Sequence, residues 1–323
     1  MKRAILAAVA VACMVAVAAA PYPVAQANEP VSAPDVLALP GDQFFPESIA
    51  SGPDGTLYVS SLVTGEIVRF RPGSAVAEAF VSADVNIGTG GVAVDAQRNV
   101  LWACAVDITF QSTFMLRAFD LRTGALRASY PVADEGLCAD LALANGDVYV
   151  TDATDPTAVP LRPARLLRLR TPDPRQPTGG VLSVWSADPL FTGQGGTLQI
   201  DGIAFDGGST IYLTNVSTGQ MLKVGIARDG SALPAAEVNF GELFSSPDGI
   251  RMLNRFELLV VELTGRLLRV NVVTRTKTVL REGLDEPTAV AITRTGKWVT
   301  EGQVLRQQSG EPPHLPFKVR RVQ

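Results

Sequence analysis

Short apolar runs of four to six residues alternate with Gly-, Asn- and Asp-containing turns along most of the chain. The segment "IDGIAFDGGSTIYLTNVSTGQMLK" at 200–223 shows the pattern clearly, with three apolar runs separated by a Gly-rich turn and a Thr-Gly turn. Gly, Asn and Asp tolerate the positive φ angles that tight hairpins need. The segment therefore predicts three consecutive antiparallel strands, with the charged Asp201 at the start of the first.

The start of this segment recurs along the chain. Six related four-residue starts are spaced by 43, 49, 62, 47 and 40 residues, and they begin at Glu47, Gly90, Ala139, Asp201, Asp248 and Thr288. Each leads through a turn to a second apolar strand, such as "LYVSS", "VYVTD" or "LLVVE". Repeats of about 40–50 residues that each form a small sheet are typical of β-propellers.

The repeat predicts an all-β fold, a six-bladed β-propeller with four-stranded antiparallel blades. We expect "DVLALPG" at 35–41 to supply the outer strand that closes the ring onto the last blade. Two Pro-rich stretches, 154–165 and 171–180, lengthen the third repeat and are interpreted as loops within or after blade three. No helix of normal length is expected beyond the N-terminal leader.

The N-terminus resembles a bacterial secretory signal peptide. Lys2 and Arg3 precede an apolar run over 4–20, and Ala25-Gln26-Ala27 forms a small-x-small cleavage site. We expect residues 1–27 to be a signal peptide and 28–323 to be one propeller domain in the periplasm or outside the cell. An uncleaved anchor and a lipoprotein attached through Cys13 are the weaker alternatives. We expect no stable membrane insertion of the mature chain.

The composition of the chain argues against some kinds of partner and metal site. The whole chain has 28 basic and 32 acidic residues, and the leader removes two basic residues and no acidic ones. An acidic chain without a basic patch does not favour binding to nucleic acid. His314 is the single histidine, close to the C-terminus, so a multi-histidine metal site is excluded. Of the three cysteines, Cys104 and Cys138 remain after cleavage, and in an oxidising compartment they either pair or stay free.

Equivalent positions of the blades should form rings around the central tunnel. The first ring contains three carboxylates, Glu47, Asp201 and Asp248. The end of the second strand returns to the same mouth and supplies a second polar ring, which consists of Ser61, Ala105, Asp152, Asn215, Glu262 and Glu301. Alone, Asp201 or Asp248 is readily explained as a turn residue, as Asp54 is at the other end of blade one.

Carboxylates crowded at one mouth repel one another, and a hard cation relieves this repulsion. The first ring therefore predicts a divalent metal site on Glu47, Asp201 and Asp248. Ca²⁺ is the first choice because it accepts oxygen ligands from distant parts of a chain, with Zn²⁺ and Mn²⁺ as alternatives.

The segments "FPESIASGPDGTLYVSSLVTGEIVRF", "IDGIAFDGGSTIYLTNVSTGQMLKV" and "SPDGIRM" resemble the senescence marker protein/gluconolactonase (regucalcin-like) family. The resemblance spans about 44–306 and implies a six-bladed propeller that holds one divalent metal and hydrolyses sugar lactones. The family ligands are a Glu, an Asn and an Asp at the starts of blades one, four and five, which implies Glu47, Asp201 and Asp248 here. Where the family has a further Asn in blade three, this chain has Ala139, with Asp140 beside it.

The leading hypothesis is a metal-dependent lactone or ester hydrolase acting on a small-molecule substrate. Asp248 would accept a proton from the attacking water, and Asp152, Asn215, Glu262 and Glu301 would line the substrate pocket. The rival is a non-catalytic exported propeller that binds a ligand or a protein partner. A third hypothesis is a strictosidine-synthase-like condensing enzyme, in which Glu262 or Glu301 is the acidic residue facing an amine.

Overall fold

The computed structural model describes residues 34–83, 85–134, 136–153, 162–193 and 198–323. The chain divides into two compact units, 1–32 and 33–323, and only the second is described. The predicted leader and the Pro-rich residues 154–161 lie outside the described residues. Among the described residues, no helix is long and apolar enough to cross a membrane.

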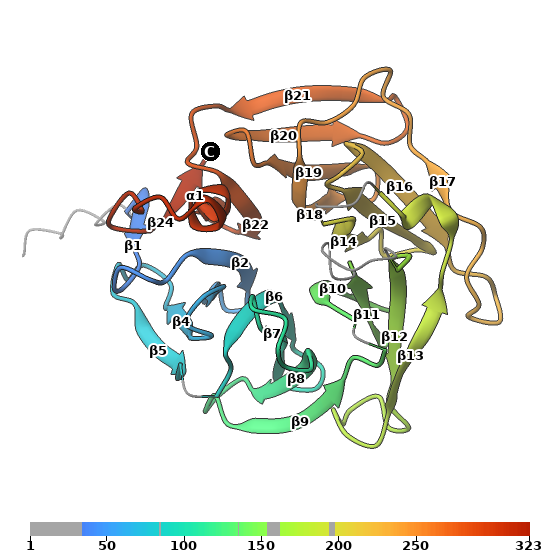
Figure 1. The fold of residues 1–323 in the computed structure, drawn as a ribbon, viewed down its shortest axis with the longest axis horizontal. Coiled ribbons are helices and arrows are strands. Elements are labelled where there is room, and N and C mark those ends of the chain that lie inside the picture. The colour runs from blue at the N-terminus through green and yellow to red at the C-terminus, as the bar shows by residue number, and fades with distance from the viewer. Residues whose placement is uncertain (1–33, 84, 135, 154–161, 194–197) are drawn as a thin grey trace, which may run out of the picture. The chain divides into compact units, whose positions relative to one another are not determined.

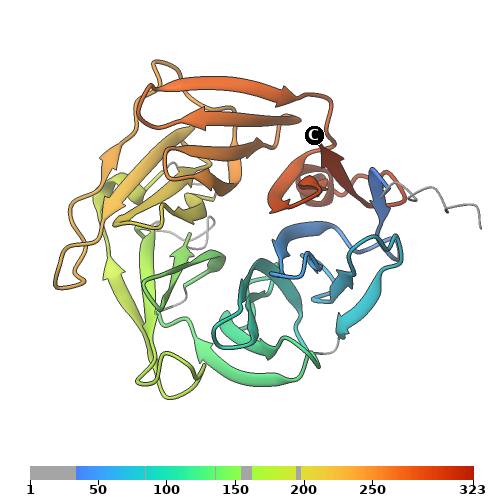
Figure 2. The ribbon, with the colours of Figure 1, turned by 180° about the vertical axis from the view of Figure 1, so that it is seen from behind.

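The second unit is a six-bladed β-propeller, as the repeat predicts, and each blade is a four-stranded antiparallel sheet. Figures 1 and 2 show the blades arranged around a common centre, with strands β2, β6, β10, β14, β18 and β22 innermost. These inner strands span Pro46–Ser51, Gly88–Asp95, Cys138–Ala144, Ile200–Phe205, Pro247–Asn254 and Pro287–Thr293.

Three further strands complete each of the first five blades in chain order. They are β3 (Leu57–Ser61), β4 (Ile67–Phe70) and β5 (Glu78–Val81); β7 (Val100–Val106), β8 (Met115–Asp120) and β9 (Leu126–Pro131); β11 (Asp147–Asp152), β12 (Arg165–Arg170) and β13 (Val181–Ser186); β15 (Thr210–Asn215), β16 (Gln220–Gly225) and β17 (Ala236–Glu237); β19 (Glu257–Glu262), β20 (Arg266–Asn271) and β21 (Thr276–Arg281). The Pro-rich loop 171–180 connects β12 to β13 and so lies within blade three, as predicted.

The sixth blade is assembled from both ends of the described chain. Its inner strands are β22 and β23 (Gly296–Glu301), followed by β24 (Lys318–Val322), and its outermost strand is β1 (Val36–Ala38). Leu37 pairs with Val319, and Figure 1 shows β1 beside β24. This confirms that the segment 35–41 closes the ring. A short helix, α1 (Val304–Ser309), lies between β23 and β24.

The hydrophobic core is divided among the spaces between neighbouring blades. One cluster joins Trp102, Leu116 and Tyr130 of blade two to Leu141 and Val150 of blade three. Another joins Ile49 and Val59 of blade one to Trp298 and Val319 of blade six. Because no blade can bury both faces alone, each depends on its neighbours, and burial of apolar surface stabilises the ring as a whole.

The two cysteines retained in the predicted mature chain form a disulfide bond between blades. Cys104 of β7 is bonded to Cys138 at the start of β10, and both side chains are fully buried. Of the two alternatives left open by the sequence, the paired state is therefore the one found. The bond ties the second blade to the innermost strand of the third.

Candidate metal centre

Every innermost strand begins with a β-bulge at the same register position. In blade one Pro46 pairs with Ser61 and the next pair is Ile49 with Val59, so two residues stand unpaired between them. The same gap follows residues 89, 138, 200, 247 and 287 in the other blades. The first bulge residue is the first-ring position predicted from the repeat, so the six blades align as expected. A bulge re-aims the side chains it contains, here at the start of each inner strand.

Three of these first bulge residues are carboxylates that the fold brings together. Glu47, Asp201 and Asp248 come from blades one, four and five, and each offers an oxygen atom within 4.8 Å of the others. Asp201 is 5% exposed and Asp248 is 6% exposed. Glu47 is half-buried as a residue, but its Oε2 is fully buried and has no hydrogen-bond partner.

Sequence reasoning did not include the fourth carboxylate of this cluster. Asp140 is the second bulge residue of blade three, where the other blades have small residues. It is 7% exposed, its Oδ2 accepts a hydrogen bond from the Ile203 backbone N–H at 3.3 Å, and its buried Oδ1 has no partner. A Cβ on Gly91 would lie 2.5 Å from that Oδ1, so the Gly at 91 makes room for it. The signal was present, since Asp140 follows Ala139 directly.

The four carboxylates oppose one another's ionisation. Burial raises the pKa of Asp201 to about 7, with a further contribution from the charge of Asp140. The pKa values of Asp248 and Glu47 are raised by burial first and then by the neighbouring carboxylates. Asp248 and Asp201 share a side-chain hydrogen bond, which favours the protonated form of Asp248 and the ionised form of Asp201.

Asp140 differs from the other three because a cation opposes the effect of its burial. Burial raises its pKa, whereas the charge of Arg251 and the backbone N–H groups of Leu141 and Ile203 lower it. The arrangement therefore concentrates carboxylate oxygens, two of them buried without partners, and among the described residues the charge of Arg251 partly offsets theirs. Such hard oxygen donors fit a divalent cation such as Ca²⁺, which would replace the protons that these carboxyl groups otherwise hold.

A second feature that sequence reasoning missed fixes the bulges in place. Ser60, Thr151, Thr214 and Thr300, each near the end of a second strand, hydrogen-bond the bulge backbone. Thr214 also donates to the Asp248 carbonyl oxygen at 2.7 Å and so links blade four to blade five. The signal is the Ser or Thr that precedes the final polar residue in "VSS", "VTD", "LTN" and "VTE".

The predicted second ring also occupies equivalent register positions, but its side chains are engaged inside the blades. The Asp152 carboxylate accepts hydrogen bonds from Arg162, Arg165 and the Leu137 backbone. The pairs Glu262–Arg266 and Glu301–Arg320 have N–O distances of 2.6 and 2.7 Å.

Asn215 donates to the Phe191 carbonyl oxygen and accepts from Thr218. These contacts fasten loops and third strands to the blade, and the substrate-pocket role of the four residues stays a prediction.

Two other residues that the sequence singles out lie away from the cluster. Asp54 accepts hydrogen bonds from the backbone and hydroxyl of Thr56, as a turn residue would. His314 is exposed, and its Nδ1 lies 2.9 Å from Asp285 Oδ2.

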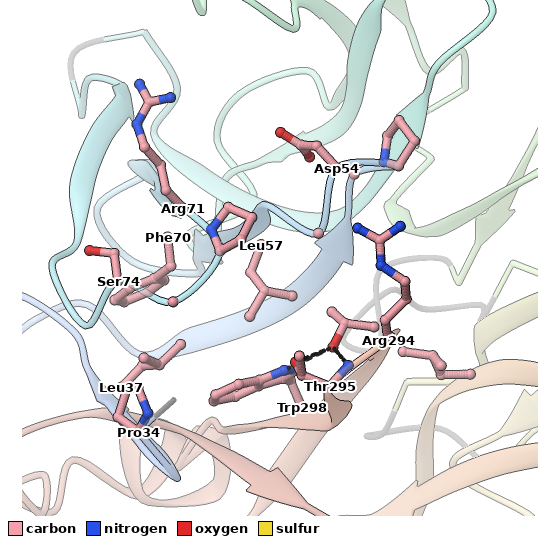
Figure 3. A pocket seen from close by; sticks show the side chains of 17 residues that line it. Pro34, Leu37, Asp54, Leu57, Phe70, Arg71, Ser74, Arg294, Thr295 and Trp298 are labelled. Atoms are coloured by element: carbon pink, nitrogen blue, oxygen red, sulfur yellow. Dashed lines mark hydrogen bonds between the residues drawn. The ribbon is translucent and has the colours of Figure 1, made fainter. Parts of the chain in front are cut away.

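Three cavities in the described part of the chain are lined by residues other than the four carboxylates. The largest, about 510 Å³, lies at the seam between blades one and six. Figure 3 shows Leu37, Leu57, Phe70 and Trp298 around it, with Asp54, Arg71 and Arg294 nearby.

Comparison with known proteins supports the fold. The model "Strictosidine synthase-like, N-terminal" matches residues 24–70, a segment that contains Glu47. No curated protein matches the chain.

Among solved structures, a calcium-binding protein, regucalcin, from Agrobacterium tumefaciens is 11% identical, with 87% of this chain and 90% of that chain covered and a TM-score of 0.58. The PQQ-bound aldose sugar dehydrogenase of Streptomyces coelicolor is 15% identical, with 90% and 99% covered and a TM-score of 0.57. A virginiamycin B lyase from Staphylococcus aureus is 14% identical, with 82% and 80% covered and a TM-score of 0.57. At these identities the likeness establishes that the chain shares the propeller fold.

Proposed function

We propose that the protein is an exported, divalent-metal-dependent hydrolase of lactones or esters. The observation that carries the proposal is the convergence of Glu47, Asp201 and Asp248 within 4.8 Å, with the Glu47 Oε2 buried and unpartnered. The likeness to a calcium-binding regucalcin supports Ca²⁺ as the metal. The predicted leader at 1–27 and the Cys104–Cys138 disulfide support export, since such bonds persist in oxidising compartments.

The residues of the chain have distinct roles in this proposal. Glu47, Asp201 and Asp248 hold the cation, whose binding requires that they give up their protons. When bound, the cation supplies Lewis acidity toward a substrate carbonyl. Asp248 accepts the proton of the attacking water at a carboxylate oxygen, as the sequence suggested. Asp140, with Oδ1 unpartnered and Oδ2 fixed by Ile203, keeps its orientation and adds negative charge beside the cation.

The first test is calorimetric titration of Ca²⁺ into chelator-treated mature protein, beside Asp248→Ala and the control Asp229→Asn. Asp229 is a carboxylate in an exposed turn outside the cluster. We expect one site in the native and control proteins and none in Asp248→Ala. A panel of sugar lactones and aryl esters, assayed with and without chelator, should then show metal-dependent turnover. Lack of Ca²⁺, Zn²⁺ and Mn²⁺ binding by the native protein would disprove the metal centre.

Metal binding without turnover on this panel would favour the rival function, a non-catalytic propeller that binds a ligand or protein. The match of residues 24–70 to a strictosidine synthase-like model favours the third function, a condensing enzyme. Glu262 and Glu301, its candidate acidic residues, are paired with arginines. Condensation of an amine with an aldehyde that survives chelation and is lost in Glu262→Gln or Glu301→Gln would support that function over metal-dependent hydrolysis.

A further inference from the structure

The end of the inner strands away from the carboxylates contains an exception to the repeat. Three residues after each first bulge residue, five blades have alanine and blade five has arginine, giving Ala50, Ala93, Ala142, Ala204, Arg251 and Ala291. Across the strand pair each alanine faces an aromatic residue, Tyr58, Trp102, Tyr149, Tyr212 or Trp298. Arg251 faces Leu259. Blade five therefore departs from the others both at the inner-strand position and at the facing position on the second strand.

The five alanines and Arg251 surround a cavity of about 290 Å³ to which all six inner strands contribute. Arg251 is the single charged residue among the residues that line it. Five of the others are alanines, and most of the remainder, Val94, Leu143, Phe205, Met252 and Ile292, are larger apolar residues. The hydroxyl of Ser51, also in the lining, donates to the Ile292 carbonyl oxygen at 2.9 Å.

The guanidinium of Arg251 is weakly engaged by the protein. Within the described part of the chain, its one hydrogen bond runs from Nε to the Val290 carbonyl oxygen and is long, at 3.4 Å. Arg251 forms no ion pair among the described residues, although its charge interacts with that of Asp140. The terminal N–H groups of Arg251 are thus free to bind an anion.

We propose that this cavity, named here the Arg251 cavity, is a second binding site that takes a small carboxylate with a short aliphatic chain. A guanidinium binds a carboxylate through two parallel hydrogen bonds, which are stronger than neutral ones. The apolar lining suits an aliphatic body, and the volume lies at the small end of the range for ligand pockets. The site does not depend on the proposed hydrolase.

The test is calorimetric titration with butyrate and hexanoate, with butylamine as the charge-reversed probe, in the presence of chelator. We expect one site for the two carboxylates and none for the amine. Arg251→Gln should weaken binding by roughly tenfold to a hundredfold, the range for a charge-assisted hydrogen-bonded pair. Arg251→Lys should fall between, because it keeps the charge and loses the planar fork.

Two matched variants make the result interpretable. Arg294→Gln removes an exposed arginine just after the end of β22, beside the cavity at the seam between blades one and six. This variant should bind butyrate as the native protein does. Leu143→Trp fills the cavity from a half-buried wall position and should block binding while Arg251 is intact. It therefore tests the cavity even if the Arg251 variants misfold. Unchanged affinity in folded Arg251→Gln, or carboxylate binding that requires Ca²⁺, would overturn the proposal.

Discussion

Asp201 illustrates how position in the repeat changes the chemistry of a single residue. Its carboxyl pKa is raised to about 7 by burial and by Asp140, whereas an unfolded Asp titrates near pH 4. In metal-free protein the folded state therefore binds more protons than the unfolded state between these values. Its contribution to the free energy of unfolding is complete below about pH 4 and is lost as the pH rises toward about 7.

We therefore expect metal-free protein to become less stable as the pH rises from about 4.5 to 7.5, and bound cation to reverse the loss. Urea unfolding in chelator across this range measures it. Asp201→Asn removes one of the titrating carboxyls and should flatten the dependence. An identical slope in the variant would show that Asp201 does not titrate abnormally.

Asp140 permits a second test at the residue scale. Asp140→Asn keeps an oxygen that can accept from the Ile203 N–H and removes one negative charge from the cluster. We expect Ca²⁺ affinity to fall about tenfold, which corresponds to about 1.4 kcal/mol. The measurement is calorimetric titration at one pH and salt concentration, with Asp206→Asn, in an exposed turn, as the control. Unchanged affinity would show that Asp140 does not act on the cation.

The repeat was sufficient to predict the convergence of Glu47, Asp201 and Asp248, because identical register places them at one end of the inner strands. It was not sufficient for Asp140, which occupies the second bulge position rather than the first. Whether its carboxylate reaches the cluster depends on the space left by Gly91 in the neighbouring blade, and spacing along the sequence does not report such a contact.

At the scale of elements, the bulge is the unit that positions the carboxylates of the proposed metal centre. The hydrogen bond from Thr214 in β15 to the Asp248 carbonyl oxygen in β18 joins two blades at this point. Thr214→Val keeps the shape and leaves that buried carbonyl without its hydroxyl partner, so the free energy of unfolding should fall by about 1–3 kcal/mol.

Urea unfolding measures this loss, and Thr274→Val is the control. Thr274 is exposed in a turn, and we expect its replacement to change stability by less than about 0.5 kcal/mol. If the two variants lose equal stability, the link between blades is not important. A weakened Ca²⁺ affinity in Thr214→Val alone would further tie the hydroxyl to the placement of Asp248.

The pairing of the second-ring residues could not be predicted from the repeat either. Their shared position suggested a common role at the tunnel mouth, but the partners lie on third strands and loops. Arg165, Arg266 and Arg320 each pair with the acidic residue at the end of the neighbouring second strand. Burying these carboxylates requires such partners, since an unpaired buried charge is costly.

At the scale of the whole molecule, the disulfide adds a covalent link between blades two and three. Cys104 and Cys138 are separated by 34 residues, and a loop of that size corresponds to a stabilisation of about 4 kcal/mol in the chain-entropy model. The double variant Cys104→Ala/Cys138→Ala should lose roughly this amount. Urea unfolding of oxidised, reduced and double-variant protein measures it, and equal stability of the oxidised and reduced forms would contradict the assignment.

The pairing of β1 with β24 also has a consequence for the order of assembly. Val36 pairs with Arg320, so β1, the first described strand, cannot pair until the segment around residue 320 has been synthesised. A chain made from its N-terminus can build five blades in sequence, but in the sixth blade β1 has no partner until β24 at Lys318–Val322 is made. Until then the hydrophobic cluster that contains Ile49 and Val59 lacks Phe317 and Val319. We therefore expect closure of the ring to be a late step in folding, because it depends on a strand from each end of the propeller.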